Sequence, residues 1–155
     1  MKYSIDTSAL LEGWRRFYPP DVFPALWEKL EELIESGELR ATEEVFHEIE
    51  RKDDELHKWV RDHANMFIPL DEQIQIAVLE ILQDHKRLLD TRKNRSGADP
   101  FVIALAKLEA CTVVTNERAT NSENKPNIPD VCSALGIRAI NLLELIREQG
   151  WIFRS

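Results

Sequence analysis

Several features that define other protein classes are missing from this 155-residue chain. It has only two cysteines, Cys111 and Cys132, so neither a disulfide framework nor a cysteine-based zinc site is indicated. No apolar run approaches the roughly 20 residues that span a bilayer, and Asp6 interrupts the segment where a signal peptide would be apolar. Because neither segment is present, we expect the protein to stay in the cytoplasm. The length suits one compact unit, so we expect a single domain over residues 1–155.

An excess of positive charge is also missing. The chain has 20 basic and 28 acidic residues, a net charge of −8, which argues against a protein that coats nucleic acid by bulk electrostatics. Any RNA binding must therefore depend on local charge. The candidate is a basic stretch just before Ser96, in which the possible RNA contacts are Arg87, Arg92, Lys93 and Arg95. An ordinary solvated loop is the alternative interpretation.

Short β-prone segments alternate with stretches of helical spacing along the whole chain. The expected strands are residues 3–5, 39–41, 67–68, 111–115 and 137–140. Parallel strands need crossover helices between them. The alternation therefore predicts an α/β fold, a three-layer α/β/α sandwich around a parallel sheet of four to five short strands.

Capping residues mark where some of the helices begin. Thr7 or Ser8 can cap the first helix, and Asp99 has the character of an N-cap because Pro100 follows it. At the other end of the chain, residues 151–153 form a short hydrophobic tail that we expect to pack back on the core.

Four carboxylates fall where functional groups gather in such sheets, beyond the carboxyl ends of the strands. They are Asp6, Glu48, Asp99 and Glu117. Carboxylates that converge in a low-dielectric cleft need a compensating cation, and Mg²⁺ or Mn²⁺ prefers oxygen ligands of this kind. The sequence therefore indicates a metal site.

Each of these residues also has a structural alternative. Asp6 could cap the first helix and Asp99 the later one, while Glu48 could belong to a solvated face with Glu44 and Lys52. Glu44 lies one helical turn from Glu48 and competes with it for the role in the cluster.

The motifs around these carboxylates resemble those of a known family. They are Ser4–Leu10, Thr42 through Ile49, Ala98–Leu105 and Val113–Glu117. In this order and spacing the chain resembles the PIN-domain family, in its VapC-type toxin-like ribonuclease branch, from Tyr3 to Phe153.

This resemblance implies a PIN-like fold and a function. Asp6, Glu48, Asp99 and Glu117 would form the catalytic and metal-binding quartet of an endoribonuclease, with one or two Mg²⁺ or Mn²⁺ ions that activate water. The hydroxyls of Thr7, Ser8 and Thr115 would orient the carboxylates. The resemblance further implies a homodimer that is the toxin of a toxin–antitoxin pair, with an antitoxin protein as its partner.

The fourth motif departs from the family pattern. Glu117 stands where Asp or Asn is usual, and Asp130 could supplement it. A non-catalytic PIN-like scaffold that binds RNA or a partner protein is therefore the alternative. A phosphatase of the haloacid dehalogenase type is excluded, since it needs a second Asp where Ser8 stands. No GxSxG, HExxH or P-loop motif is present.

Overall fold

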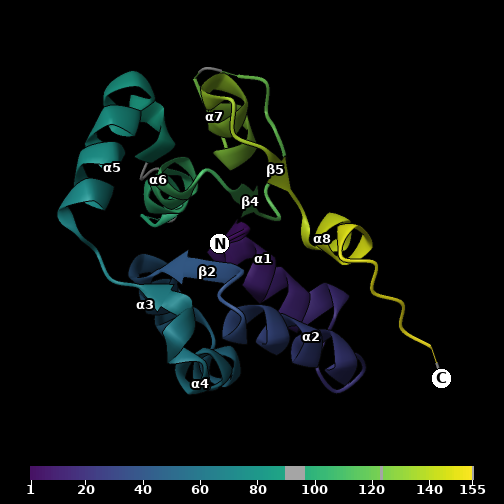
Figure 1. The fold of residues 1–155 in the computed structure, drawn as a ribbon. Coiled ribbons are helices and arrows are strands. Elements are labelled where there is room, and N and C mark those ends of the chain that lie inside the picture. Colours follow the sequence, from purple (N-terminus) through teal and green to yellow (C-terminus); the bar gives the residue numbers. More distant parts are fainter. Residues whose placement is uncertain (90–96, 123, 155) are drawn as a thin grey trace.

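The computed structural model describes residues 1–89, 97–122 and 124–154. Within this part of the chain, five strands form one parallel sheet in the order β3-β2-β1-β4-β5. The strands are β1 (Tyr3–Ile5), β2 (Leu39–Thr42), β3 (Phe67–Ile68), β4 (Thr112–Val114) and β5 (Ala139–Ile140). Helices flank the sheet, so the predicted three-layer α/β/α architecture is confirmed (Figure 1).

The direction of chain progress reverses at the pair β1 and β4. From β1 the chain moves to β2 and β3, whereas β4 lies on the other side of β1 and leads to β5. Ile5 is in register with Val114, and the pairing continues one residue further, since the Asp6 N–H donates to the Val114 carbonyl at 2.8 Å. In open parallel sheets, ligands bind beyond the carboxyl ends of the strands at such a reversal.

Helices cover both faces of the sheet (Figure 1). One group contains α1 (Thr7–Glu12), the π-helix η1 (Gly13–Phe17), α2 (Pro24–Glu35), α3 (Glu43–Lys52), α4 (Asp54–Asp62) and α8 (Leu142–Glu148). The other contains α5 (Glu72–Asp84), α6 (Asp99–Glu109) and α7 (Ile128–Leu135). Short 3-10 turns, η2 (Ala64–Met66) and η3 (Lys86–Leu89), precede β3 and follow α5.

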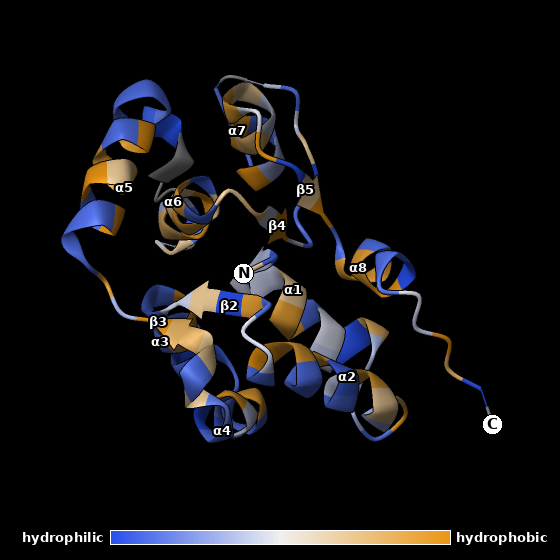
Figure 2. Cartoon of the chain, in the orientation of Figure 1, coloured by the Kyte–Doolittle hydropathy of each residue, from blue (hydrophilic) through white to orange (hydrophobic). Residues whose placement is uncertain are grey.

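The helices are held by amphipathic packing. In α2, Leu26, Leu30 and Ile34 follow helical spacing and are fully buried, while Lys29 and Glu32 pair on the outer side. Figure 2 shows this as alternating hydrophobic and hydrophilic stretches along the helices. Helices of this length gain most of their stability from such burial. None of the helices in the described ranges has the length and apolarity needed to cross a membrane.

Two local predictions were wrong, and a third holds only in part. Neither Thr7 nor Ser8 caps α1, because Thr7 is already its first residue. The preceding residue is Asp6, whose side chain makes no capping hydrogen bond because Ser8 and Thr115 bond its carboxylate. Asp99 is the first residue of α6 rather than its cap, which is Ala98. The C-terminal tail packs only through Trp151, since Ile152 is 68% exposed.

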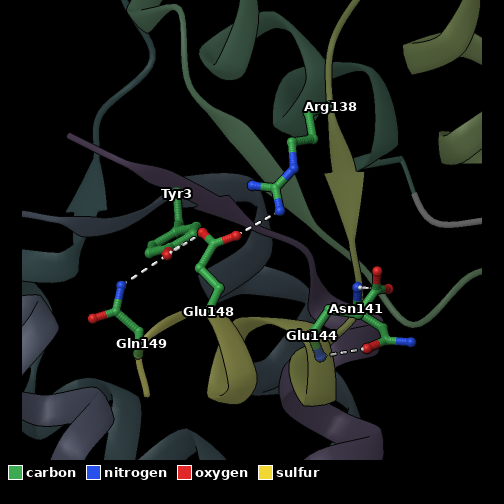
Figure 3. A network of polar contacts seen from close by, with 6 residues as sticks. All are labelled: Tyr3, Arg138, Asn141, Glu144, Glu148 and Gln149. Atoms are coloured by element: carbon green, nitrogen blue, oxygen red, sulfur yellow. Dashed lines mark hydrogen bonds and ion pairs between the residues drawn. The ribbon is translucent and has the colours of Figure 1, made fainter. Parts of the chain in front are cut away.

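A polar network ties the first strand to the last helix at the edge opposite Asp6. The Tyr3 hydroxyl donates to Glu148 at 2.5 Å and accepts from Gln149 at 2.8 Å (Figure 3). Arg138 donates to the other oxygen of Glu148. Burial, together with the hydrogen bond to Glu148, raises the pKa of Tyr3 to about 12, so this phenol stays protonated as a donor.

Candidate metal centre

Three carboxylates meet beyond the carboxyl ends of the two central strands. Asp6 directly follows β1, Asp99 begins α6, and Glu117 lies in the segment after β4. Their ligand oxygens all lie within 4.8 Å of one another. Asp6 and Asp99 are each only 1% exposed and Glu117 is partly exposed, so the acidic cluster is largely buried and is not a solvated surface patch.

Glu48 lies next to this cluster but outside the group of three. It projects from α3, is 3% exposed, and accepts a hydrogen bond of 2.7 Å from the Thr7 hydroxyl. Its negative charge still reaches Asp6, whose pKa it raises slightly. Three members of the predicted quartet are thus in mutual reach, and the fourth is anchored beside them by Thr7.

Two hydroxyls hold the Asp6 carboxylate. Ser8 donates to Asp6 Oδ2 at 2.6 Å, and Thr115 donates to the same oxygen at 2.9 Å. The backbone N–H of Asn116 donates to Ser8 Oγ at 2.9 Å, and that of Glu117 to Thr115 Oγ1 at 3.1 Å. Each hydroxyl oxygen therefore accepts a hydrogen bond from a backbone N–H, and each O–H donates to Asp6. These hydrogen bonds fix the orientation of the Asp6 carboxylate.

The electrostatics of the cluster oppose ionisation. Burial raises the pKa of Asp6 to about 6, and the charge of Glu117 adds to this, while the hydrogen bonds from Ser8 and Thr115 act in the other direction. Nearby, burial followed by the charges of Asp6 and Glu117 raises the pKa of the Cys132 thiol to about 12. Burial is the main cause of both shifts, and the contributions of neighbouring carboxylates add a local excess of negative charge that a cation would relieve.

A cleft of about 210 Å³ opens onto the cluster. Its lining includes Asp6, Thr7, Ser8, Leu11, Glu12, Lys52, Asp99 and Glu117. One water takes up about 30 Å³ in the liquid, so the space suits an ion that keeps several waters. Magnesium usually binds in this way, through one or two carboxylates plus waters. The donors and the room therefore fit a hard divalent cation.

The sequence analysis did not single out Lys52 as a site residue. Among the described residues that line the cleft, it provides the one positive charge. A signal for it exists, because Lys52 lies four residues after Glu48 on α3 and so shares a helix face with it. The alternative of a solvated face with Glu44 does not hold for Glu48, which is buried, whereas Lys52 is exposed at the cleft.

Two other predicted acidic candidates lie away from the cluster. Glu44, in the first turn of α3, is half-buried, and burial raises its pKa. Burial alone would raise the pKa of Asp130, but hydrogen bonds from the N–H groups of Thr120, Asn127 and Asn121 outweigh it and lower that pKa. Asp130 therefore holds a loop and does not supplement Glu117.

The basic stretch is only partly described. Arg92, Lys93 and Arg95 lie outside the described residues. Arg87, with His85 and Lys86, lines a separate hollow of about 570 Å³ beside α7. Arg87 therefore does not line the acidic cleft.

Comparison with known proteins gives a family without an assigned activity. Residues 3–153 match a family described as Domain of unknown function (DUF4411). No curated protein matches the chain. The matched range runs from β1 to beyond α8 and contains every carboxylate of the cluster.

Proposed function

For this member of the DUF4411 family, a domain of unknown function, we propose the activity of a metal-dependent endoribonuclease that hydrolyses RNA phosphodiester bonds. The observation that carries the proposal is the convergence of Asp6, Asp99 and Glu117 within 4.8 Å. Buried like charges in such proximity are costly without a cation. A divalent ion is the compensation that this oxygen-only donor set favours.

The proposed ligands are Asp6, Asp99 and Glu117, with Glu48 as the fourth acidic member of the site. A magnesium or manganese ion held there would activate a water molecule and neutralise the negative charge that develops on the phosphate. In the described part of the chain, both hydroxyl donors of Asp6 bind Oδ2, which leaves Oδ1 for the ion. Lys52 lines the same cleft and can pair with a phosphate oxygen.

The choice of RNA as the substrate rests on the resemblance of four sequence motifs to PIN-domain ribonucleases. Asp6, Asp99 and Glu117 come from three of these motifs and converge, and Glu48 from the remaining motif lies beside them. A cleft of about 210 Å³ at the cluster has room for one phosphate group of a polymer and not for a whole small molecule.

The test combines cleavage with metal binding. The purified protein is incubated with a labelled single-stranded RNA in Mn²⁺ or Mg²⁺, with and without EDTA, and Mn²⁺ binding is measured separately by calorimetry. We expect Asp6→Asn to reduce cleavage by about 100-fold or more, because a metal ligand contributes several kcal/mol to transition-state stabilisation. The same variant should weaken Mn²⁺ binding.

The matched controls lie on α3. Glu48→Gln should reduce cleavage, whereas Glu44→Gln, which changes a half-buried carboxylate outside the cluster, should leave it intact. Equal cleavage by the wild type and Asp6→Asn, or cleavage that EDTA does not affect, would contradict the proposal.

A non-catalytic PIN-like scaffold that binds RNA or a partner protein is the second candidate. The observation that favours it is the state of Glu117, whose Oε1 already accepts from the Ile128 N–H at 3.0 Å. Mn²⁺ binding without cleavage of any tested RNA would favour this candidate.

The toxin role, the antitoxin partner, the homodimer and the cytoplasmic location belong to the same proposal and rest on the family resemblance. Co-expression with the product of an adjacent small gene should yield a complex in which cleavage is blocked. Light scattering of the purified chain should give the mass of a dimer. A monomer that no neighbouring gene product inhibits would remove this part of the proposal.

A further inference from the structure

A second hollow lies next to the acidic cleft and is named here the side pocket. It has a volume of about 240 Å³. Apolar side chains of Ala9, Leu142 and Leu143 form part of its lining. The other lining residues are Gly13, Phe17, Tyr18, Asn116, Arg118 and Asn141. Pockets that hold a whole small molecule usually measure about 300–1,000 Å³, so this one suits a single part of a larger ligand.

The side pocket and the cleft share a wall. On α1, Ser8 faces the cleft while Ala9 lines the side pocket, and after β4, Glu117 faces the cleft while Asn116 lines the side pocket. The Asn116 N–H donates to Ser8 Oγ, and Ser8 donates to Asp6. A ligand in the side pocket would therefore contact Ala9 and Asn116, which are the sequence neighbours of Ser8 and Thr115, the two residues whose hydroxyls donate to Asp6.

The rings of Phe17 and Tyr18 line the side pocket at the end of the π-helix η1. Helix α1 continues into the π-helix η1, which ends with the Tyr18 N–H bonded to the Gly13 carbonyl at 2.8 Å. This turn leaves Phe17 52% exposed beside Tyr18, with the Arg16 guanidinium 5.6 Å from the Phe17 ring centre. Turns of the π type are frequent at functional sites, and exposed aromatic rings offer surfaces on which bases stack.

Polar groups at the side pocket are available to a ligand. In the ranges that the structure describes, the side chains of Asn116 and Arg118 have no hydrogen-bond or ion-pair partner. Asn141 Oδ1 accepts from the Glu144 N–H at 2.8 Å, which leaves its amide NH₂ group for other contacts (Figure 3). Amide and guanidinium groups are the side chains that read the edges of unpaired bases.

We propose that the side pocket binds one unpaired nucleobase of single-stranded RNA and so sets the sequence preference of cleavage. The inference rests on the proposed function, since the base would belong to a nucleotide next to the phosphate in the cleft. Stacking on Phe17 or Tyr18, with edge contacts from Asn116 and Arg118, would supply the recognition. These groups favour a base over a peptide, because they combine π-faces with unpaired amide and guanidinium donors.

The first test measures base binding without cleavage. Neutral nucleosides are titrated into metal-free protein, since they carry the base but no phosphate that the acidic cluster would repel. Backbone NMR shifts should change at residues 13–18, 116–118 and 141, and more for some bases than for others. No shift there with any nucleoside at millimolar concentration would overturn the inference.

The second test uses paired variants. Phe17→Ala and Arg118→Gln should each weaken nucleoside binding by about 5- to 100-fold, the range expected for loss of one stacking contact, and should relax the sequence preference of cleavage. Phe153→Ala and Arg61→Gln change an exposed aromatic and an exposed cation elsewhere and should have no effect.

The outcomes separate the inference from the proposed function. Cleavage whose sequence preference is unchanged in both side-pocket variants would overturn the inference and leave the nuclease intact. Nucleoside binding at the side pocket in a protein that cleaves no RNA would support base binding and contradict the nuclease. Shifts caused by a peptide of the adjacent gene product, with none from nucleosides, would overturn base recognition.

Discussion

Two carboxylates, one near each end of strand β1, have pKa values shifted in opposite directions. At the start of the strand, Glu148 accepts from the Tyr3 hydroxyl and pairs with Arg138, and the Arg138 hydrogen bond is the main reason why its pKa is lowered. Beyond the end of the strand, Asp6 is buried with Glu117 and Asp99, and its pKa is raised to about 6.

The difference contrasts a carboxylate whose charge the protein balances with one whose charge it does not. Glu148 has a cation and a hydroxyl donor in place. Asp6 has hydroxyl donors that orient it but shares its surroundings with other acids, so protonation or, in the proposed function, a bound cation would relieve its charge. Perturbed carboxylates in a cleft are candidates for function for this reason.

The largest expected effect is an opposite response of the two ends to pH in metal-free protein. Because the fold raises the pKa of Asp6 from 3.8 to about 6, its contribution to stability is complete below pH 3.8 and lost as the pH rises through 6. At about 1.4 kcal/mol per pKa unit, the loss is up to roughly 3 kcal/mol. The lowered pKa of Glu148 gives a contribution that is present above its ordinary 4.5 and lost as the pH falls.

Urea unfolding in EDTA, between about pH 4 and pH 7, measures this response. Asp6→Asn should remove most of the loss of stability at the upper end of the range, and Glu148→Gln should remove part of the loss at the lower end. A pH profile of Asp6→Asn that matches the wild type would show that Asp6 does not carry the effect.

The acidic end should be the one that metal stabilises. At a Mn²⁺ concentration 100 times the dissociation constant, binding to the folded state alone adds about 2.7 kcal/mol, or a rise in Tm of roughly 5–10 °C. Differential scanning fluorimetry checks this, with Asp6→Asn as the variant that should lose the rise and Tyr3→Phe as the one that should keep it. An equal rise in Asp6→Asn would locate the metal elsewhere.

The sequence predicts the acidic end of β1 better than the end at Tyr3, because only the acidic end follows from the positions of the strands. The parallel sheet follows from the alternation of apolar segments with amphipathic helices, and the five predicted strands are all present with slightly different ends. The approach of Asp6, Asp99 and Glu117 follows from their places beside central strands. The partners of Tyr3, Glu148 and Gln149, lie 145 and 146 residues away along the chain and leave no local pattern.

Finer details of the site depend on side-chain geometry that spacing does not contain. Glu48 and Glu44 lie one helical turn apart on α3, and only the packing shows that Thr7 bonds Glu48. Asp99 has the sequence character of a cap, but Ala98 takes that position and Asp99 lies inside the helix. The side pocket depends on the π-helix η1, whose hydrogen-bond pattern has no signature in the spacing of the residues.

A smaller effect is expected when the support of Asp6 is removed without changing its charge. Thr115→Val keeps the shape of the side chain but deletes the hydroxyl that donates to Asp6 at 2.9 Å. Loss of a group that orients a metal ligand typically reduces metal affinity or activity about 10- to 100-fold. Cleavage rates and Mn²⁺ calorimetry test this, with Thr120→Val as a control in a loop outside the cleft. Unchanged values in Thr115→Val would show that Ser8 alone is sufficient.

The smallest effect belongs to the balanced end of the strand. Tyr3→Phe removes the hydrogen bonds to Glu148 and Gln149 and should lower the free energy of unfolding by about 1 kcal/mol. Thermal unfolding should show a decrease in Tm of roughly 2–4 °C, with cleavage unchanged. A marked fall in cleavage would mean that the two ends of β1 are coupled.

The hydrogen bond from the Asp6 N–H to the Val114 carbonyl fixes the backbone that carries the proposed metal ligand. The hydrogen-bonded ladder extends past the assigned strands, since Thr115 also donates to the Ile140 carbonyl. The backbones of Asp6 and Thr115 are therefore held by the hydrogen-bonded ladder of the central strands and not by a loop that would have to fold around a ligand. Such preorganisation would lower the entropy lost when the proposed ion binds.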